Sequence, residues 1–244
     1  MALMNALPLL GEIKQALRDL KEKGEPYIIY SNKLPTTLED RYFLQDVLGK
    51  GELFMYEKVV HTKAVAFNTL IPGVWIELVF SDKDPHEPIL EMVRIDYSPL
   101  SFTMQNEDLR EGFEKFNSDV QAMKNRLTPF AFEVVKAFEG YLKDGKGRTL
   151  TDPEGLENLT YYLVTEAELI IENKSNGNEI VSTNYHGLWL ERTKEQKPVA
   201  MHVGDFPHIF KPTPEDLEKG IALIEERKKH FLPKYEKRID IPLM

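Results

Sequence analysis

The 244-residue sequence contains no cysteine. Disulfide bonds, thiolate nucleophiles and cysteine-ligated zinc or iron–sulfur centres are therefore excluded. The sequence also lacks any apolar run near the roughly 20 residues that span a bilayer. A short apolar patch at the N-terminus has no basic flank before it and soon meets Glu12, which argues against a secretory signal. We expect no membrane insertion and a cytoplasmic location.

Positive charge is in deficit, since 31 Lys and Arg stand against 40 Asp and Glu, for a net charge of −9. A protein that binds nucleic-acid phosphates needs a basic face, so we expect no nucleic-acid partner. One stretch, residues 225–238, is locally basic. We interpret it as a solvated helix end and tail.

The common catalytic motifs are missing as well. There is no phosphate-binding loop, no dinucleotide fingerprint, no Gly-x-Ser-x-Gly elbow and no His-Glu-x-x-His helix. One segment, "HVGDFPH", gathers His202 and His208 around Asp205, but the first half of the chain has no histidine at the matching places. We interpret it as a polar strand end, and we predict no catalytic residue, no metal and no cofactor.

What the sequence does contain is a match to itself. Residues 7–24 align with residues 127–145, with Pro8 on Pro129 and Gly24 on Gly145. The apolar residues of both segments keep the spacing of an amphipathic helix, with proline in its first turn and glycine just beyond its end. These apolar positions are Leu9, Ile13, Leu17 and Leu20 in the first segment and Phe130, Val134, Phe138 and Tyr141 in the second.

The only two tryptophans extend this self-similarity. Trp75 and Trp189 each stand in a Gly-aliphatic-Trp-aliphatic-Glu sequence, "GVWIE" and "GLWLE". A catalytic group would rarely occur twice, whereas a core position of a repeated fold is expected in each copy. We therefore predict a structural role for the matching residues of the two motifs, which are Gly73, Trp75 and Glu77 in the first and Gly187, Trp189 and Glu191 in the second.

Helices around successive hairpin-linked strands indicate an α+β fold with antiparallel sheet. Asn176-Gly177 between two β-rich runs is a strong hairpin signal. We predict a tandem duplication of a helix, antiparallel-sheet and helix unit, with the two copies packed together and each closed by its own last helix. The predicted divisions are a first repeat at 1–117, a linker helix at 118–126, and a diverged second repeat with a basic C-terminal tail at 127–244.

A short aromatic and proline segment follows the last strand of each copy. These segments are "DYSPLSF" and "DFPHIF", matched through Asp96-Tyr97 and Asp205-Phe206. They either pack the final helix or contact a partner, because loops on a rigid scaffold often carry binding. The candidate partner-binding residues are Tyr97, Phe102, Phe206, His208 and Phe210.

The ordered set "LPLLGEIKQAL", "LPTTLEDRYFLQDVLGKGEL", "GVWIE" and "ILEMVRIDYSP" resembles the HupH/HyaF family over residues 7–117. Members of that family are accessory proteins encoded with uptake nickel–iron hydrogenases. The resemblance implies a non-catalytic chaperone in the maturation or assembly of such a hydrogenase. It also implies a partner, which is the iron–sulfur small subunit or another maturation factor.

A second reading comes from a different class of protein. A cleft between the two repeats would suit a small-ligand-binding protein or an enzyme, with His202, Asp205 and His208 near its mouth. Metal content separates the two readings, since only this one predicts a bound metal that is lost when the histidines are replaced.

Overall fold

The computed structural model describes residues 3–58, 63–81 and 84–236. Residues 237 and 238 of the predicted basic helix end and tail lie outside these ranges. The chain forms two compact units. The first unit comprises Met1–Glu52, Ala66–Pro99 and Pro212–Met244, and the second comprises Leu53–Val65 and Leu100–Lys211.

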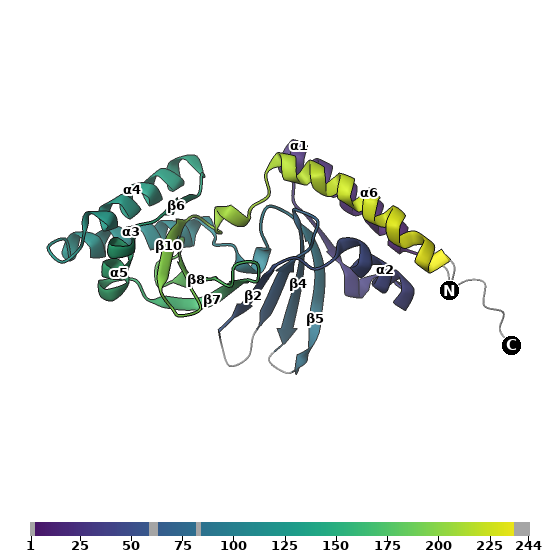
Figure 1. Ribbon diagram of the computed structural model, residues 1–244, viewed down its shortest axis with the longest axis horizontal. Coiled ribbons are helices and arrows are strands. Elements are labelled where there is room, and N and C mark those ends of the chain that lie inside the picture. The colour runs from purple at the N-terminus through teal and green to yellow at the C-terminus, as the bar shows by residue number, and fades with distance from the viewer. Residues whose placement is uncertain (1–2, 59–62, 82–83, 237–244) are drawn as a thin grey trace. The chain divides into compact units, whose positions relative to one another are not determined.

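Helices and antiparallel strands occur in both units, which confirms the predicted α+β class. Figure 1 shows the elements along the chain. The α-helices of the described part of the chain are α1 (Ala6–Lys23), α2 (Leu38–Leu48), α3 (Asn106–Ala122), α4 (Pro129–Asp144), α5 (Pro153–Tyr162) and α6 (Pro214–Glu236). The strands are β1 (Tyr27–Tyr30), β2 (Leu53–Glu57), β3 (Ala64–Asn68), β4 (Val74–Ser81), β5 (Asp84–Ile95), β6 (Arg148–Leu150), β7 (Glu166–Asn173), β8 (Glu179–Thr183), β9 (Leu188–Arg192) and β10 (Pro198–Val203). The described residues also form three short 3-10 helices, namely η1 (Ser31–Lys33), η2 (Leu100–Phe102) and η3 (His208–Phe210).

In the first unit the strands run in the order β1-β5-β4-β3, and α1, α2 and α6 pack on them and on one another. The apolar face of α1, including Leu10, Ile13 and Leu17, is buried in the core of this unit. Helix α6 lies along α1 (Figure 1) and is linked to it by the ion pairs Lys14–Glu225 and Lys21–Glu218. The predicted amphipathic helix thus packs one face against the sheet and its neighbouring helices.

In the second unit the order is β2-β7-β8-β9-β10-β6, with α3, α4 and α5 packed on the strands. The β7–β8 connection contains Asn176-Gly177, and Gly177 has a φ of 76°, which suits glycine in a tight turn. Phe130, Val134 and Phe138 from α4 are buried in the core. The hairpin and the second amphipathic helix therefore lie where the sequence predicts them.

The same order of elements occurs twice along the chain. Residues 6–122 form helix, strand, helix, four strands, 3-10 helix and helix, with the short η1 between β1 and α2. Residues 129–236 repeat that order without a counterpart of η1. The last helix of each stretch, however, packs in the unit built mainly from the other stretch: α3 belongs to the second unit and α6 to the first. Each compact unit is consequently closed by a helix from the other half of the sequence, and not by its own last helix as the sequence analysis expects.

Both closing helices use a leucine to contact a glycine of the tryptophan motif. A Cβ atom at Gly73 would lie 2.5 Å from Leu217 of α6, and one at Gly187 would lie 2.6 Å from Leu109 of α3. The two glycines have φ values of +81° and +93°. The left-handed backbone conformation favours glycine at both positions, and a leucine side chain of the closing helix occupies the space that a Cβ atom would fill.

Asp40 links the start of two helices. Its Oδ1 accepts hydrogen bonds from the backbone N–H groups of residues 4–6 at 2.9–3.1 Å, and so satisfies donors at the N-terminus of α1. Its Oδ2 accepts from the N–H and hydroxyl groups of Thr37, both at 3.0 Å, and Thr37 in turn caps α2. One buried carboxylate thereby fixes α1 against α2.

The segment between the two stretches differs from the predicted linker helix at 118–126. Helix α3 ends at Ala122, residues 123–126 form turns, and α4 begins at Pro129. The compact units also differ from the predicted divisions 1–117 and 127–244, because each unit contains residues from both halves. The physical reason is the position of α3 and α6, which join units that are discontinuous in sequence.

Candidate functional site

The two tryptophan motifs have matching geometry. The indole Nε1 of Trp75 donates to the carbonyl oxygen of Asp96 at 3.0 Å, and that of Trp189 donates to the carbonyl oxygen of Gly204 at 3.0 Å. The two residues are 2% and 0% exposed. Each tryptophan ring is therefore buried, and its hydrogen bond links its own strand to the end of the next strand.

The glutamates of the motifs face basic side chains on the neighbouring strand. Glu77 is buried opposite Arg94, with Oε1 and Nε 4.0 Å apart. Glu191 Oε2 lies 3.0 Å from Nε2 of His202, and the hydrogen bond from His202 lowers the pKa of Glu191 below its usual value. The glutamates thus compensate buried cationic or hydrogen-bonding groups within the sheet.

A threonine before each motif completes a turn that the sequence analysis missed. The hydroxyl of Thr69 is 3.1 Å from the carbonyl oxygen of Ile71 and 3.0 Å from that of Val74. The hydroxyl of Thr183 lies at the same distances from the carbonyl oxygens of Tyr185 and Leu188. Longer segments, "TLIPGVWIE" and "TNYHGLWLE", therefore share one turn, and aligning the threonines as well as the tryptophans would have indicated it.

The candidate partner-binding residues are mostly enclosed. Phe102 and Phe206 are each 0% exposed, and the Phe206 ring packs edge-on against Trp189. Tyr97, His208 and Phe210 are half-buried. The apolar side chains that these segments do expose are Leu100 and Ile209, at 46% and 49%. Phe102 and Phe206 accordingly support the fold and have no surface to offer a partner.

The alignment of these aromatic segments shifts by one residue. The backbone N–H of Asp96 donates to Gly73, and that of Gly204 donates to Gly187, so Asp96 corresponds to Gly204 and not to Asp205. The tryptophan bonds described above give the same correspondence. Pro99 then matches Pro207, and η2 matches η3. The sequence comparison aligned Asp96-Tyr97 with Asp205-Phe206 because both pairs are an aspartate followed by an aromatic residue, and this alignment is wrong by one position.

The histidine cluster is held by structural contacts. Thr149 Oγ1 is 2.8 Å from His202 Nδ1, so both ring nitrogens of His202 have partners. Asp205 accepts from the Tyr141 hydroxyl at 2.8 Å and from Lys211 Nζ at 2.7 Å. Burial, together with the neighbouring His202 and Lys211, lowers the pKa of His208. His202 and Asp205 are thereby committed to other groups.

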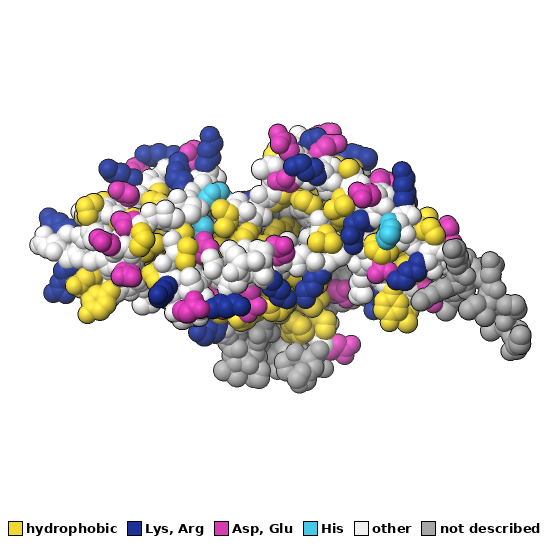
Figure 2. All heavy atoms as spheres, in the orientation of Figure 1, with side chains coloured by type: hydrophobic (Ala, Val, Ile, Leu, Met, Phe, Trp, Pro, Cys, Tyr) yellow, Lys and Arg dark blue, Asp and Glu magenta, His cyan; other side chains and the backbone are white. Residues whose placement is uncertain are grey.

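Among the described residues, no group of three or more His, Asp or Glu side chains is close enough to hold a metal ion. No helix within the same ranges is both long and apolar enough to cross a bilayer. On the face shown in Figure 2, Lys and Arg side chains are interspersed with Asp and Glu.

A cavity of about 470 Å³ opens in the first unit, between α1 and α2 on one side and the sheet on the other. Its walls are mainly apolar. Ile13 and Leu48 contribute from the helices, and Phe67, Ile76 and Val93 contribute from strands β3, β4 and β5. Mostly apolar cavities of this size, with a few polar groups, are typical of binding sites in proteins.

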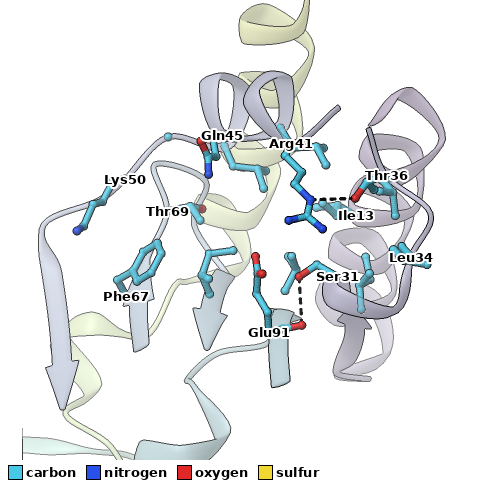
Figure 3. A pocket seen from close by; sticks show the side chains of 17 residues that line it. Ile13, Ser31, Leu34, Thr36, Arg41, Gln45, Lys50, Phe67, Thr69 and Glu91 are labelled. Carbon is cyan, nitrogen blue, oxygen red and sulfur yellow. Dashed lines mark hydrogen bonds between the residues drawn. The ribbon is translucent and has the colours of Figure 1, made fainter. Parts of the chain in front are cut away.

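The polar groups of this cavity face one another in Figure 3. The guanidinium of Arg41, on α2, points into the cavity and donates from Nε to the Thr36 hydroxyl at 3.2 Å. The carboxylate of Glu91, on β5, points in from the sheet, while its backbone oxygen accepts from Ser31 at 3.1 Å. Lys50 lies at the edge, 5.2 Å from the centre of the Phe67 ring. The cavity therefore combines a hydrogen-bond donor, Arg41, and an acceptor, Glu91, with mainly apolar walls.

Comparison with known proteins gives a match over the first half of the chain. Residues 3–123 match the family described as "HupH hydrogenase expression protein, C-terminal conserved region". The chain is 27% identical over 124 residues to the hydrogenase expression/formation protein HupQ of Azotobacter chroococcum mcd 1. It matches HoxQ of Azotobacter vinelandii, which carries the same description, to the same extent. Each match covers 50% of this chain and 43% of the relative, so the chain spans less than half the length of the curated relatives it matches.

A solved structure is also similar over part of the chain. It is the hydrogenase expression protein HupH from Thiobacillus denitrificans ATCC 25259, with 26% sequence identity and a TM-score of 0.41. The match covers 51% of this chain and 99% of that one.

Proposed function

Because the chain belongs, through residues 3–123, to the HupH family of hydrogenase expression proteins, we propose that it is an accessory protein in the maturation or assembly of an uptake nickel–iron hydrogenase. In this role it binds a hydrogenase subunit and catalyses no reaction itself. The iron–sulfur small subunit is the partner that the family resemblance favours. Because the curated relatives are longer, the activity of the whole protein is part of this proposal.

The observation that carries the proposal is the family match over residues 3–123. The described part of that region includes α1, α2 and β3–β5, which enclose the apolar cavity. A binding protein needs such a site, where apolar surface can be removed from water on association. The matched half of the chain thus contains both the family resemblance and a cavity able to bind.

The charged groups outside that cavity are consistent with a binding role. Glu191 and His202 bond to each other and to strand neighbours, and Asp205 bonds to Tyr141 and Lys211. These contacts hold strands and the segment before α6 in place. Their roles in the fold are sufficient to explain why they are buried and paired.

Deletion of the gene tests the proposal in a host that makes an uptake hydrogenase. We expect hydrogenase activity and the amount of mature small subunit to fall, and a plasmid copy of the gene to restore both. The activity of an unrelated iron–sulfur enzyme in the same cells should not change. Normal levels of mature, active hydrogenase in the deletion strain would refute the proposed role.

A further inference from the structure

We propose that the cavity of the first unit is the docking site for a partner polypeptide. An extended segment of the partner inserts an apolar side chain between α2 and the sheet. The main-chain carbonyl and amide groups beside it bind Arg41 and Glu91. This inference rests on the proposed function and specifies which surface of the protein performs it.

In the second unit, larger or more deeply buried side chains occupy the strand positions that line the cavity in the first unit. Positions can be matched through the shared turn and strand pairing, where Ile76 pairs with Val93 as Leu190 pairs with Met201. Leu190 and Met201 are buried in the core of the second unit, at 7% and 0% exposed. Ile76 and Val93 are only half-buried and line the cavity. The cavity therefore depends on the side chains of the first unit and does not follow from the turn and strand pairing that both units share.

The cavity has the dimensions of a side-chain site. Its volume of about 470 Å³ falls within the range of about 300–1,000 Å³ in which proteins bind small groups. Apolar walls from two helices and four strands would remove an aliphatic or aromatic side chain from water on most sides. Burying one such side chain increases the affinity by a factor on the order of ten to one hundred.

The charges at the mouth specify what accompanies that side chain. Among the described residues, the Nη groups of Arg41 and the carboxylate of Glu91 have no hydrogen bond or ion pair, although both point into the cavity. A guanidinium donates and a carboxylate accepts, which complements the carbonyl and N–H groups of an extended main chain. Pairing of a peptide backbone with fixed polar groups, and of its side chains with pockets, is a common mode of peptide recognition.

Two variants test the site by different physical means. Val93→Met places in the cavity the residue found at the matching position of the second unit, and so fills it. Arg41→Glu reverses the charge of an exposed residue at the mouth without altering the core. Arg110→Glu is the matched control, because it makes the same charge change on an exposed residue of α3, in the second unit.

The experiment uses the whole 244-residue chain. The chain is tagged and purified from cells that co-express the hydrogenase subunits, and overlapping short peptides covering the captured subunit are then titrated by fluorescence anisotropy. We expect apolar peptides to bind, and each site variant to weaken both capture and peptide affinity by about tenfold or more, since each removes a buried contact or a charged hydrogen bond. Arg110→Glu should bind like the wild type, and urea unfolding midpoints should stay close to the wild-type value.

The possible failures are distinguishable. If the wild-type chain captures no hydrogenase subunit, the proposed function itself fails. If the wild type captures a subunit and both folded site variants capture it equally well, the function stands and the docking site lies elsewhere. If no peptide binds but free leucine or phenylalanine does, the cavity takes a small zwitterion, and the proposal of a polypeptide partner is overturned.

Discussion

Gly112 provides the sharpest test of how α3 packs. This glycine lies in the middle of α3, and a Cβ atom built on it would lie 2.1 Å from the carbonyl oxygen of His186. That distance is far shorter than any real contact, and the obstructing atom belongs to the backbone of the turn before Gly187. Substitution by alanine must therefore displace the helix or the turn.

The magnitude follows from two opposing effects. Alanine in a helix interior is favoured over glycine by about 1 kcal/mol. Forcing extra volume into a packed interior costs about 1–3 kcal/mol, and a clash with backbone belongs at the upper end. Gly112→Ala should therefore lower the free energy of unfolding by about 2 kcal/mol.

Two other glycines serve as controls for this measurement. Gly220, which corresponds to Gly112 on α6, has its nearest neighbours 3.2–3.3 Å from a built Cβ, so Gly220→Ala should change stability by less than about 1 kcal/mol. Gly11 on α1 has nothing within 4 Å, so Gly11→Ala should stabilise by about 0.5–1 kcal/mol. Urea unfolding followed by tryptophan fluorescence measures all three. If Gly112→Ala is as stable as Gly11→Ala, then α3 does not pack against the turn at His186.

Three further outcomes follow from described contacts. Burial alone would raise the pKa of Asp40, but hydrogen bonds from Thr37, Ala6 and Asn5 hold it below the usual 3.8. The contribution of ionised Asp40 to the free energy of unfolding is therefore fully present above pH 3.8 and is lost as the pH falls through the lower folded-state pKa. Asp40→Asn should lower the free energy of unfolding by about 1–3 kcal/mol, and titrations of its stability in acid should no longer show that pH-dependent loss. Trp189→Ala should cost about 3–5 kcal/mol in urea unfolding, and a stable variant that loses partner capture would instead make Trp189 a binding residue. Phe206→Ser should lower the melting temperature by several degrees, because its ring is buried, whereas Ile209→Ser, which changes an exposed side chain, should not; equal effects would contradict the assigned burial.

The sequence predicts local structure well wherever spacing alone determines it. The apolar spacing of Leu9, Ile13 and Leu17 defines α1, and Asn176-Gly177 defines the β7–β8 hairpin. Both features depend on residues close together in the chain, so propensity and periodicity are enough. The α+β class follows from the same local signals.

The position of the closing helices could not be predicted in this way. Leu109 of α3 and Leu217 of α6 present similar apolar faces, and Gly187 and Gly73 offer them similar sites. Nothing in the periodicity of either helix says which site it occupies, because both choices bury the same kind of surface. The structure assigns each helix to the unit that the other half mainly builds.

The cavity escaped the sequence analysis for a related reason. Its walls come from α1, α2 and four strands, and no motif joins Ile13 to Phe67 or Arg41 to Glu91. Whether such apolar residues meet or leave a gap depends on how their volumes fill the space between layers. Hydropathy records that these residues are apolar and gives no measure of that gap.

Binding of purified protein to a purified hydrogenase small subunit tests the central claim most directly. Isothermal titration calorimetry of the 244-residue chain against the metal-free subunit should show saturable binding at a fixed stoichiometry. Arg41→Glu should weaken it by about tenfold or more, the effect of losing a charged hydrogen bond, while Arg110→Glu leaves it unchanged. No binding of the wild-type chain to either the small or the large subunit would contradict the account.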